Sequence, residues 1–285
     1  MGAMLFSAVA ALIKMIGLRL PVSEILLVRQ VVMLMATLPM IFRHFPDALI
    51  TKKPWHHAAR ICCALVAMFA GFTAVVHLPL ADVTALGFAK SFFITIFAIV
   101  FLKEIVGIRR WSAIIIGFAG VLIMLNPGAG EFNIYGVLAI VGAAAAGLVM
   151  ILIRYLSRFD PPMTILTYQT IFVGLLAAPV ALYQWVWPTP REALILLAIG
   201  LVSLLGQMCN IRAFAAGEAT AIAALDYTRL LWAAIIGFFV FAETPSATTL
   251  IGAAIIIGAS IYTVWREAKR GQQLARSPIG RGDAP

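Results

Sequence analysis

The chain has 285 residues, of which 63% are hydrophobic and only 12% are charged, and its mean hydropathy is +1.02. A water-soluble domain of this length has too little polar surface to cover so much apolar side chain, so the composition excludes a soluble protein. The formal net charge of +9 does not indicate nucleic-acid binding, because the basic residues lie between hydrophobic runs and form no stripe on a soluble domain.

Ten apolar runs follow one another, separated by short clusters of Pro, Gly, Arg, Lys and Asn. A helix needs about 20 mostly apolar residues to cross a hydrocarbon core of about 30 Å. Continuous apolar runs argue against a β-barrel, whose strands alternate polar and apolar residues. We therefore predict an all-α integral membrane protein with ten transmembrane helices, at residues 2–18, 22–42, 58–78, 80–102, 110–126, 134–154, 163–184, 192–212, 219–241 and 247–265.

The basic residues predict how these helices are oriented. With the N-terminus inside, the cytoplasmic segments carry fifteen Lys and Arg, whereas the external loops carry only Arg19 and Arg191. The positive-inside rule then predicts a multi-pass protein of the cell inner membrane with both termini in the cytoplasm. The first run lacks a basic leader and an Ala-x-Ala site, so we expect a retained helix. Residues 266–285 are polar, basic and rich in Gly and Pro, and are predicted to be a disordered cytoplasmic tail.

The chain repeats itself with a period of about 139 residues. Lys90 precedes Glu104 by fourteen residues in the first copy, and Arg229 precedes Glu243 by the same fourteen in the second. We take residues 1–126 as the first five-helix repeat and residues 134–265 as the second. Because five is an odd number of crossings, the second copy must be inverted in the membrane, which is a common architecture of secondary transporters.

Two segments carry a family resemblance: "FLKEIVGIRRWSAIIIGFAGVLIMLNPG" and "FVFAETPSATTLIGAAIIIGASIY". With two five-helix halves and a glutamate after the fourth span of each half, the chain resembles the EamA-type proteins of the drug/metabolite transporter superfamily. The sequence departs from the family pattern in having Lys103 and Ala242 before these glutamates, where glycine is common.

The resemblance implies a secondary carrier of small metabolites, often an exporter of amino acids, with a central cavity lined mainly by the first four helices of each half. The aromatic amino acid exporter branch is the nearest group that it suggests. We expect a small-molecule substrate, no cofactor, no metal and no nucleic acid, and a monomer or homodimer in the lipid bilayer.

Lys90 and Arg229 are the leading candidates for substrate binding. A Lys or Arg at the centre of a transmembrane helix costs roughly 2.5–3.5 kcal/mol on insertion scales, so such residues usually face a cavity or a partner. In one interpretation they are paired cations at the cavity that hold a carboxylate, an organic anion or a helix carbonyl, and in the other each neutralises an internal acid or caps a broken helix. Asp226 lies one turn before Arg229. Its alternative roles are a structural ion pair with Arg229, the coupling of transport to protons, and the binding of a substrate ammonium.

Further candidates are weaker, because ordinary packing accounts for each of them as well. The amides of Gln207 and Asn210 either join neighbouring helices or line a polar cavity. An aromatic pocket for apolar substrate groups is predicted from Phe88, Phe92, Tyr168, Gln169, Tyr227 and Trp232.

Arg29 and His77 are candidates for gating or coupling, and Glu104 and Glu243 for a structural role in binding the free amides of the next helix. Lys14 is expected to extend to the membrane interface, and His56 and His57 to lie on a solvated cytoplasmic face.

Competing functions are less well supported by the sequence. The chain has no HExxH, GxSxG or Walker motif, which argues against an enzyme and against an ATP-driven pump. The runner-up is an uptake or exchange carrier for nucleoside-like metabolites or organic anions. A channel is a weaker alternative, because the sequence shows no ring of filter ligands.

Overall fold

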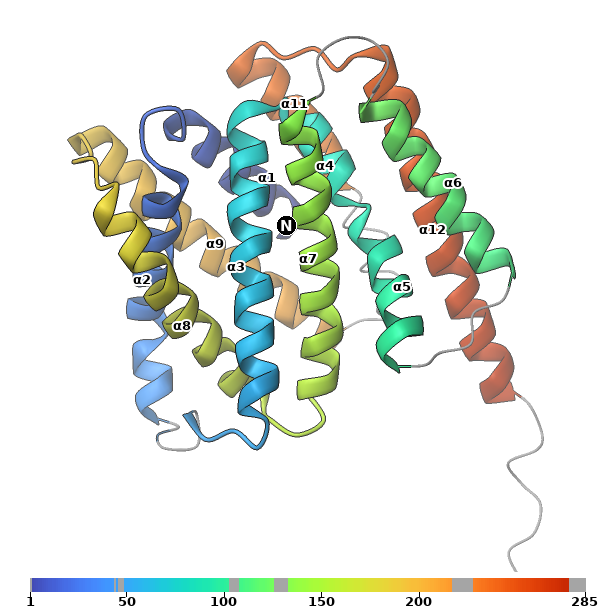
Figure 1. Cartoon of the computed structure of the whole chain (residues 1–285), viewed down its shortest axis with the longest axis horizontal. Helices are drawn as coiled ribbons and strands as arrows, with labels where there is room; N and C mark the ends of the chain where they lie inside the picture. Colours follow the sequence, from blue (N-terminus) through green and yellow to red (C-terminus); the bar gives the residue numbers. More distant parts are fainter. Residues whose placement is uncertain are drawn as a thin grey trace, which may run out of the picture.

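The computed structural model describes residues 2–43, 45, 49–102, 108–125, 133–216 and 228–276, and these residues contain helices and no strand. Five apolar helical stretches in this part are long enough to cross a membrane, and four shorter apolar helices accompany them. The helices are α1 (Gly2–Ile16), α2 (Val22–Arg43), α3 (Pro54–His77), α4 (Leu80–Gly87), α5 (Lys90–Leu102), α6 (Ile108–Leu125), α7 (Ile134–Leu156), α8 (Pro162–Tyr183), α9 (Pro190–Ala216), α11 (Thr228–Phe241) and α12 (Ala247–Arg276) (Figure 1).

The fourth predicted span differs from the continuous helix expected over residues 80–102. It is divided into α4 and α5, and the backbone between them tightens into turns in which Phe88 donates to the Ala85 carbonyl and Ala89 to the Leu86 carbonyl. These i to i−3 bonds replace the i to i−4 bonds of an α-helix. Counted with α4 and α5 as one crossing, the described helices make ten spans.

The end of the last helix also differs from prediction. Helix α12 continues to Arg276, so residues 266–276 are helical and not disordered as predicted, because "REAKRGQQLAR" consists mostly of good helix formers. Residues 277–285 lie outside the described residues. The predicted start of the ninth span, at residue 219, also lies outside the described residues, and the described helix of that span is Thr228–Phe241.

The helices pack in an arrangement that is unchanged when the two halves are exchanged. Helix α1 packs on α9 and α3 packs on α7, which are equivalent pairs, and α2 with α8 and α6 with α12 each pair an element with its own counterpart. Figure 1 shows α6 and α12 side by side at one edge of the bundle.

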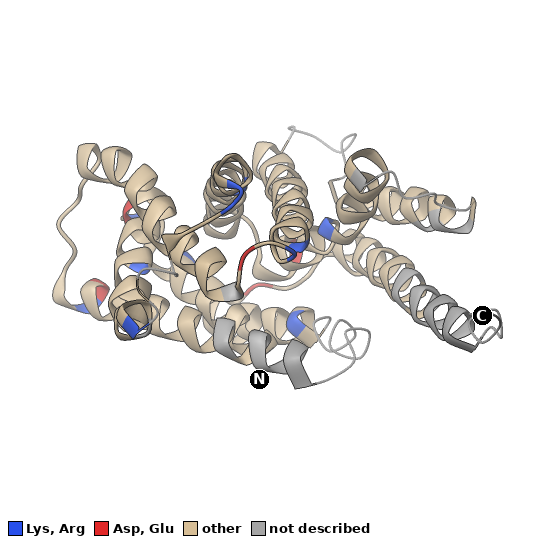
Figure 2. Cartoon of the chain, turned by 90° about the horizontal axis from the view of Figure 1, so that it is seen from below, with Lys and Arg blue, Asp and Glu red and all other residues tan. Residues whose placement is uncertain are grey.

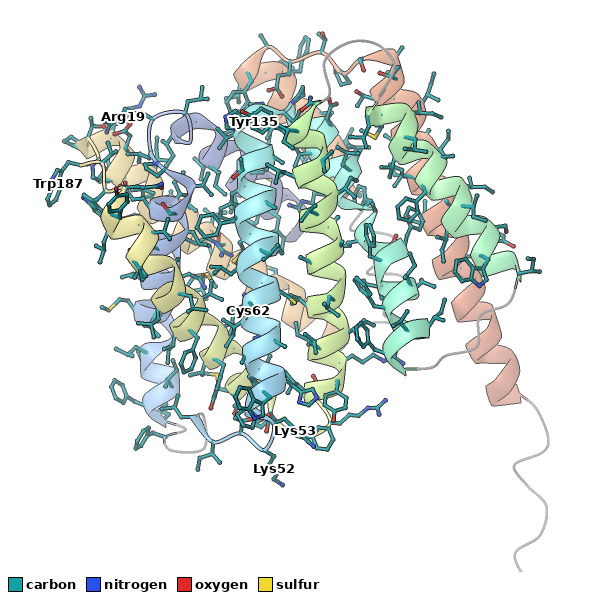
Figure 3. All side chains as sticks on the ribbon, viewed as in Figure 1. Arg19, Lys52, Lys53, Cys62, Tyr135 and Trp187 are labelled. Atoms are coloured by element: carbon teal, nitrogen blue, oxygen red, sulfur yellow. The ribbon has the colours of Figure 1, made fainter. Side chains whose placement is uncertain are left out.

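The equivalent helices α1 and α7 run in opposite directions. Arg19, which follows α1, and Tyr135, which begins α7, lie at the same end of the bundle as Trp187 (Figure 3). We call this the upper end, and the end that carries Lys52 and Lys53 the lower end. The second half is therefore inverted relative to the first, as the odd number of spans predicts.

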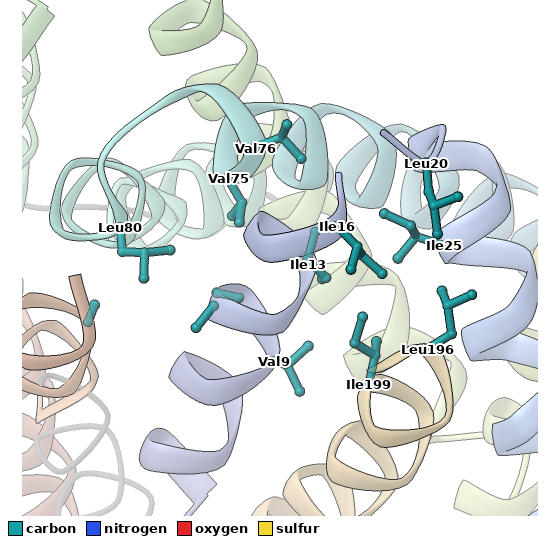
Figure 4. Packing of buried hydrophobic residues seen from close by; sticks show 13 residues of the cluster. Val9, Ile13, Ile16, Leu20, Ile25, Val75, Val76, Leu80, Leu196 and Ile199 are labelled. Carbon is teal, nitrogen blue, oxygen red and sulfur yellow. The ribbon is translucent and has the colours of Figure 1, made fainter. Parts of the chain in front are cut away.

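The buried core joins the two halves. One cluster of apolar side chains contains Val9, Ile13 and Ile16 of α1 together with Leu196 and Ile199 of α9 (Figure 4). Two further clusters combine α3, α4, α5 and α6 with α7 and α12, and α2 and α3 with α8. Because each cluster contains helices of both halves, the halves are interleaved around a shared interior and do not form separate lobes. Charged residues are sparse on the described helices seen from below (Figure 2).

Candidate functional site

A cavity of about 400 Å³ lies where the two halves meet. Its wall is formed mainly by apolar side chains from α1, α3, α4 and α7, with contributions from α2, α5, α8 and α11. The polar side chains that line it are Arg29, Thr84, Lys90, Gln169 and Arg229. No Asp or Glu is among the described residues of the lining.

Lys90 and Arg229 occupy equivalent places in the two halves. Lys90 is the first residue of α5, directly after the break in the fourth span, and Arg229 is the second residue of α11. The Arg229 guanidinium lies 5.6 Å from the centre of the Phe6 ring, and its carbonyl accepts a hydrogen bond from Ser7 Oγ at 3.1 Å. The structure brings both predicted cations to the same cavity.

Arg29 and Gln169 also reach the cavity, from α2 and α8. Arg29 is 8% exposed, and its Nε donates to Ser203 Oγ of α9 at 2.9 Å. Phe88, at the break between α4 and α5, is the one aromatic residue of the predicted pocket that lines the cavity among the described side chains.

Four other residues that the sequence suggested for binding or gating do not line the cavity. Phe92 is 1% exposed and packs in the cluster around Phe118, and Trp232 of α11 is not part of the lining. Tyr168 donates to the Leu49 carbonyl at 3.0 Å, near the lower end. His77 ends α3 at the upper end, where its ring stacks on Tyr135 at 4.0 Å.

Some predicted residues lie beyond what the structure describes. Asp226, Tyr227 and Glu104 lie outside the described residues, and Gln207 and Asn210 belong to α9 but their side chains lie outside the described part. Across the described residues, no three His, Cys, Asp or Glu side chains group as metal ligands would.

Glu243 binds a different helix from the one expected. Its Oε2 accepts a hydrogen bond from the Leu80 amide at 2.9 Å, so it caps α4 of the first half and not α12, which follows it in sequence. Its Oε1 forms an ion pair with Lys14, which also donates to the Leu78 carbonyl. Lys14 therefore joins the two halves at the upper end and does not simply extend to the interface.

The loop between α7 and α8 is bound to the start of α3 at the lower end by a group of contacts that we call the lower clasp. Asp160 accepts hydrogen bonds from Thr51 Oγ1 at 2.6 Å and from the Lys52 amide at 3.3 Å, and His57 Nε2 lies 2.9 Å from its Oδ2. Burial alone would raise the pKa of Asp160, but hydrogen bonds from Thr51, His57 and Lys52 outweigh it and lower the pKa. His57 is 1% exposed, so it is not on the solvated face that the sequence suggested.

The upper end has the equivalent contact, which we call the upper clasp. Arg19, in the loop after α1, forms an ion pair with Glu192 in the first turn of α9. It also donates to the Trp187 carbonyl at 3.1 Å, and Thr189 Oγ1 donates to Glu192 at 2.7 Å (Figure 3). Each clasp thus joins a loop of one half to the first turn of a helix in the other, at opposite ends of the molecule.

Sequence comparison places these features in a known group. The sequence model of the EamA-like transporter family matches residues 1–126 and 133–265. The chain belongs to the EamA-like transporter family. Membership in the EamA family confirms the resemblance deduced from the sequence and the ten-span, all-α membrane fold.

Three proteins with similar sequences are named as transporters of particular compounds. An S-adenosylmethionine uptake transporter of Rickettsia felis is 28% identical over 256 residues, which is 90% of this chain and 87% of that protein. A riboflavin transporter of Brucella anthropi is 29% identical over 271 residues, 92% of this chain and 95% of that protein. A pseudopaline exporter of Pseudomonas aeruginosa is 30% identical over 258 residues, 90% of each chain.

One solved crystal structure shares the fold with a TM-score of 0.59 at 18% identity, over 94% of this chain and 98% of that chain. Together with the EamA family match, these comparisons identify the protein as a multi-pass membrane transporter.

Proposed function

We propose that this transporter is a secondary carrier that moves a small organic metabolite across the inner membrane by alternating access. The cavity of about 400 Å³ at the junction of the two halves carries the proposal. Its volume lies in the range of small-molecule sites, about 300–1,000 Å³, and its mostly apolar wall with a few polar groups has the composition of such sites. Inverted-repeat transporters bind substrate at this junction.

The lower end is proposed to face the cytoplasm. Arg43, Lys52, Lys53, Arg154 and Arg158 lie in or beside its connections, whereas the described connections of the upper end carry Arg19 and Arg191. Cytoplasmic loops are enriched in Lys and Arg, so this asymmetry supports both termini inside.

The proposed substrate is a nucleoside-like or flavin-like metabolite that enters the cell. Two of the relatives are named for S-adenosylmethionine uptake and for riboflavin transport, and both compounds combine a flat heteroaromatic ring with a polar chain. An apolar cavity with a few cationic groups suits such a molecule. Export of amino acids or their derivatives is the second candidate, and similarity to a pseudopaline exporter supports the outward direction.

Uptake into proteoliposomes tests the proposal. Purified protein should move radiolabelled S-adenosylmethionine, riboflavin or L-tryptophan with saturation, and the Lys90→Ala and Arg229→Ala variants should lose most of this transport while remaining folded. Arg191→Ala is the matched control, because Arg191 is an exposed cation in the first turn of α9 away from the cavity. Full transport by a well-folded double variant of Lys90 and Arg229 would exclude these residues from the site.

A further inference from the structure

Arg29 is a buried cation held by neutral groups. Its guanidinium donates to Ser203 Oγ at 2.9 Å and to Gln30 Oε1 at 3.2 Å, lies 3.9 Å from the Met68 sulfur, and is 5.9 Å from the centre of the Phe72 ring. Within the described part of the chain, no carboxylate forms an ion pair with it. Its Nη2 donates to no acceptor among the described residues, although an arginine has five N–H donors.

A second buried arginine belongs to the same hydrogen-bond network as Arg29. Arg60 of α3 is 1% exposed, and it donates to the Ile165 carbonyl at 3.2 Å and to Gln169 Oε1. Gln30 in turn donates to the Gln169 carbonyl at 3.3 Å. The two glutamines therefore direct acceptor oxygens at the two guanidinium groups and fix the Arg29 side chain in place before any substrate arrives.

Arg29 lies on the wall of the cavity, and none of the described residues offers it a carboxylate. A buried arginine held only by neutral groups is costly in a membrane protein, and removal from water makes its attraction for an anion stronger. Arg29 therefore has the setting of a cation whose counter-ion arrives with the solute.

We infer that the transported solute carries an anionic oxygen group, a carboxylate or a phosphate, and that Arg29 binds it. The inference rests on the proposed transport function and specifies the chemistry of its substrate. A guanidinium can make two parallel hydrogen bonds to such a group, which an ammonium cannot. The apolar wall around Phe6, Ile13, Val75 and Val83 would then take the uncharged body of the molecule.

Pairs of compounds that differ only in the anionic group test the inference. The pairs are S-adenosylmethionine and its decarboxylated form, L-tryptophan and tryptamine, and flavin mononucleotide and riboflavin. Binding to the purified full-length protein is measured by thermal shift and by equilibrium titration. In at least one pair the anionic member should bind roughly tenfold or more tightly, the amount expected of one charge-assisted hydrogen bond. The pair that responds distinguishes a carboxylate from a phosphate.

Substitutions at Arg29 assign the effect to that residue. Arg29→Gln should bring the ratio within the responding pair close to one, and Arg29→Lys, which keeps the charge but not the paired hydrogen bonds, should leave an intermediate ratio. Arg191→Gln should leave the ratio unchanged. Gel filtration and the unfolding temperature show that each variant is folded, and Arg29→Lys decides the question if Arg29→Gln does not fold.

The contrary outcomes separate the inference from the proposed function. Equal binding within all three pairs, or an unchanged ratio in Arg29→Gln, would overturn the role of Arg29 and leave transport intact. Absence of binding and transport for all six compounds would overturn the proposed substrate classes together with the inference.

Discussion

Ala242 shows how a single residue ends a span. Its φ is 55°, in the left-handed region, which alanine occupies at a cost of roughly 1–2 kcal/mol. The Ala242 amide donates to the Phe238 carbonyl at 3.1 Å, and the Glu243 amide donates to the Gly237 carbonyl at 3.0 Å. The first is the single bond of the αL C-cap motif, in which glycine is the usual left-handed residue. This turn directs Glu243 back towards Leu80 and Lys14.

Replacing Ala242 by glycine should stabilise the protein. Ala242→Gly removes the strain but increases the conformational freedom of the unfolded chain, so the expected net gain is about 0.5–1 kcal/mol. Thermal unfolding in detergent would show it as a higher midpoint. Ala234→Gly, in the interior of α11, is the control and should lower stability by up to about 1 kcal/mol. A loss of similar size in both variants would contradict the strain at Ala242.

Asp160 should make the lower clasp sensitive to acid. Its pKa in the folded protein is below the ordinary value, so its contribution is present above pH of about 4 and is lost as the pH falls through the folded pKa. At pH 7, Asp160→Asn should lower the free energy of unfolding by about 1–3 kcal/mol, since the hydrogen bonds to a charged acceptor are weakened.

Unfolding midpoints of the wild type and Asp160→Asn, measured from pH 7 to pH 3, check this prediction. The two should converge below about pH 4. Thr51→Val keeps the carboxylate but removes one of its donors, so its stability should fall at a higher pH than that of the wild type. A difference between wild type and Asp160→Asn that is constant down to pH 3 would show that the clasp does not depend on the ionised carboxylate.

The cost of burying charge explains which of the cavity-lining residues could be picked out from the sequence. Arg29, Lys90 and Arg229 interrupt apolar runs, and a cation there needs a cavity or a partner, so their position was informative. Aromatic residues have no such cost, and Phe92 and Tyr168 pack away from the cavity. Arg60 and His57 were missed because they follow Pro54 at a span end, where a basic run is typical of solvated loops.

At the scale of elements, the number and approximate position of the helices follow from hydrophobic length, but the break before Lys90 does not. The segment "LGFAKS" contains no proline, and Gly87 alone does not distinguish a break from a flexible point in one helix. The i to i−3 bonds at Phe88 and Ala89 lie beside the cavity and among buried residues of α7 and α12, which are far away in sequence, so the local sequence does not predict them.

The crossing of α6 and α12 depends on two glycines that face each other. A Cβ atom at Gly120 would lie 2.9 Å from the Gly252 carbonyl oxygen, and one at Gly252 would lie 2.7 Å from the Gly120 carbonyl oxygen. Both contacts are with backbone, which cannot move aside as a flexible side chain can. Small residues at such contacts allow close packing of transmembrane helices.

Gly252→Ala should therefore weaken the α6–α12 pair. We expect the free energy of unfolding to fall by about 1–3 kcal/mol, as in other overpacked contacts, despite the higher helix propensity of alanine. Gly258→Ala is a matched control on the same helix, because a Cβ atom there meets nothing within 4 Å. Thermal unfolding in detergent compares them, and equal stability of the two variants would contradict the close crossing.

At the scale of the whole molecule, the two clasps lie at opposite ends of a cavity that the halves share. The upper clasp joins Arg19 to Glu192 and the lower clasp joins Asp160 to Thr51 and His57, and exchange of the halves relates their positions in the fold. Alternating access requires one end to open while the other stays closed. A ligand or substitution that weakens one clasp should then shift the population towards the state open at that end.

Accessibility of a cavity cysteine tests this coupling. Gly71 lines the cavity, and a Cβ atom there meets nothing within 4 Å, so Gly71→Cys is a suitable reporter once Cys62, Cys63 and Cys209 are replaced. A membrane-impermeant maleimide is applied separately to each side of oriented vesicles. Glu192→Gln should increase labelling from the upper side, and Asp160→Asn should increase it from the lower side.

The size and direction of the two effects decide between a moving and a static cavity. Each variant should raise labelling about two- to tenfold from its own side and reduce labelling from the other, because the two open states share one population. Arg191→Gln, an exposed change in the same turn as Glu192, should alter neither rate. If both clasp variants increased labelling from the same side, the cavity would have one permanent entrance, and the clasps would fasten the fold without controlling access.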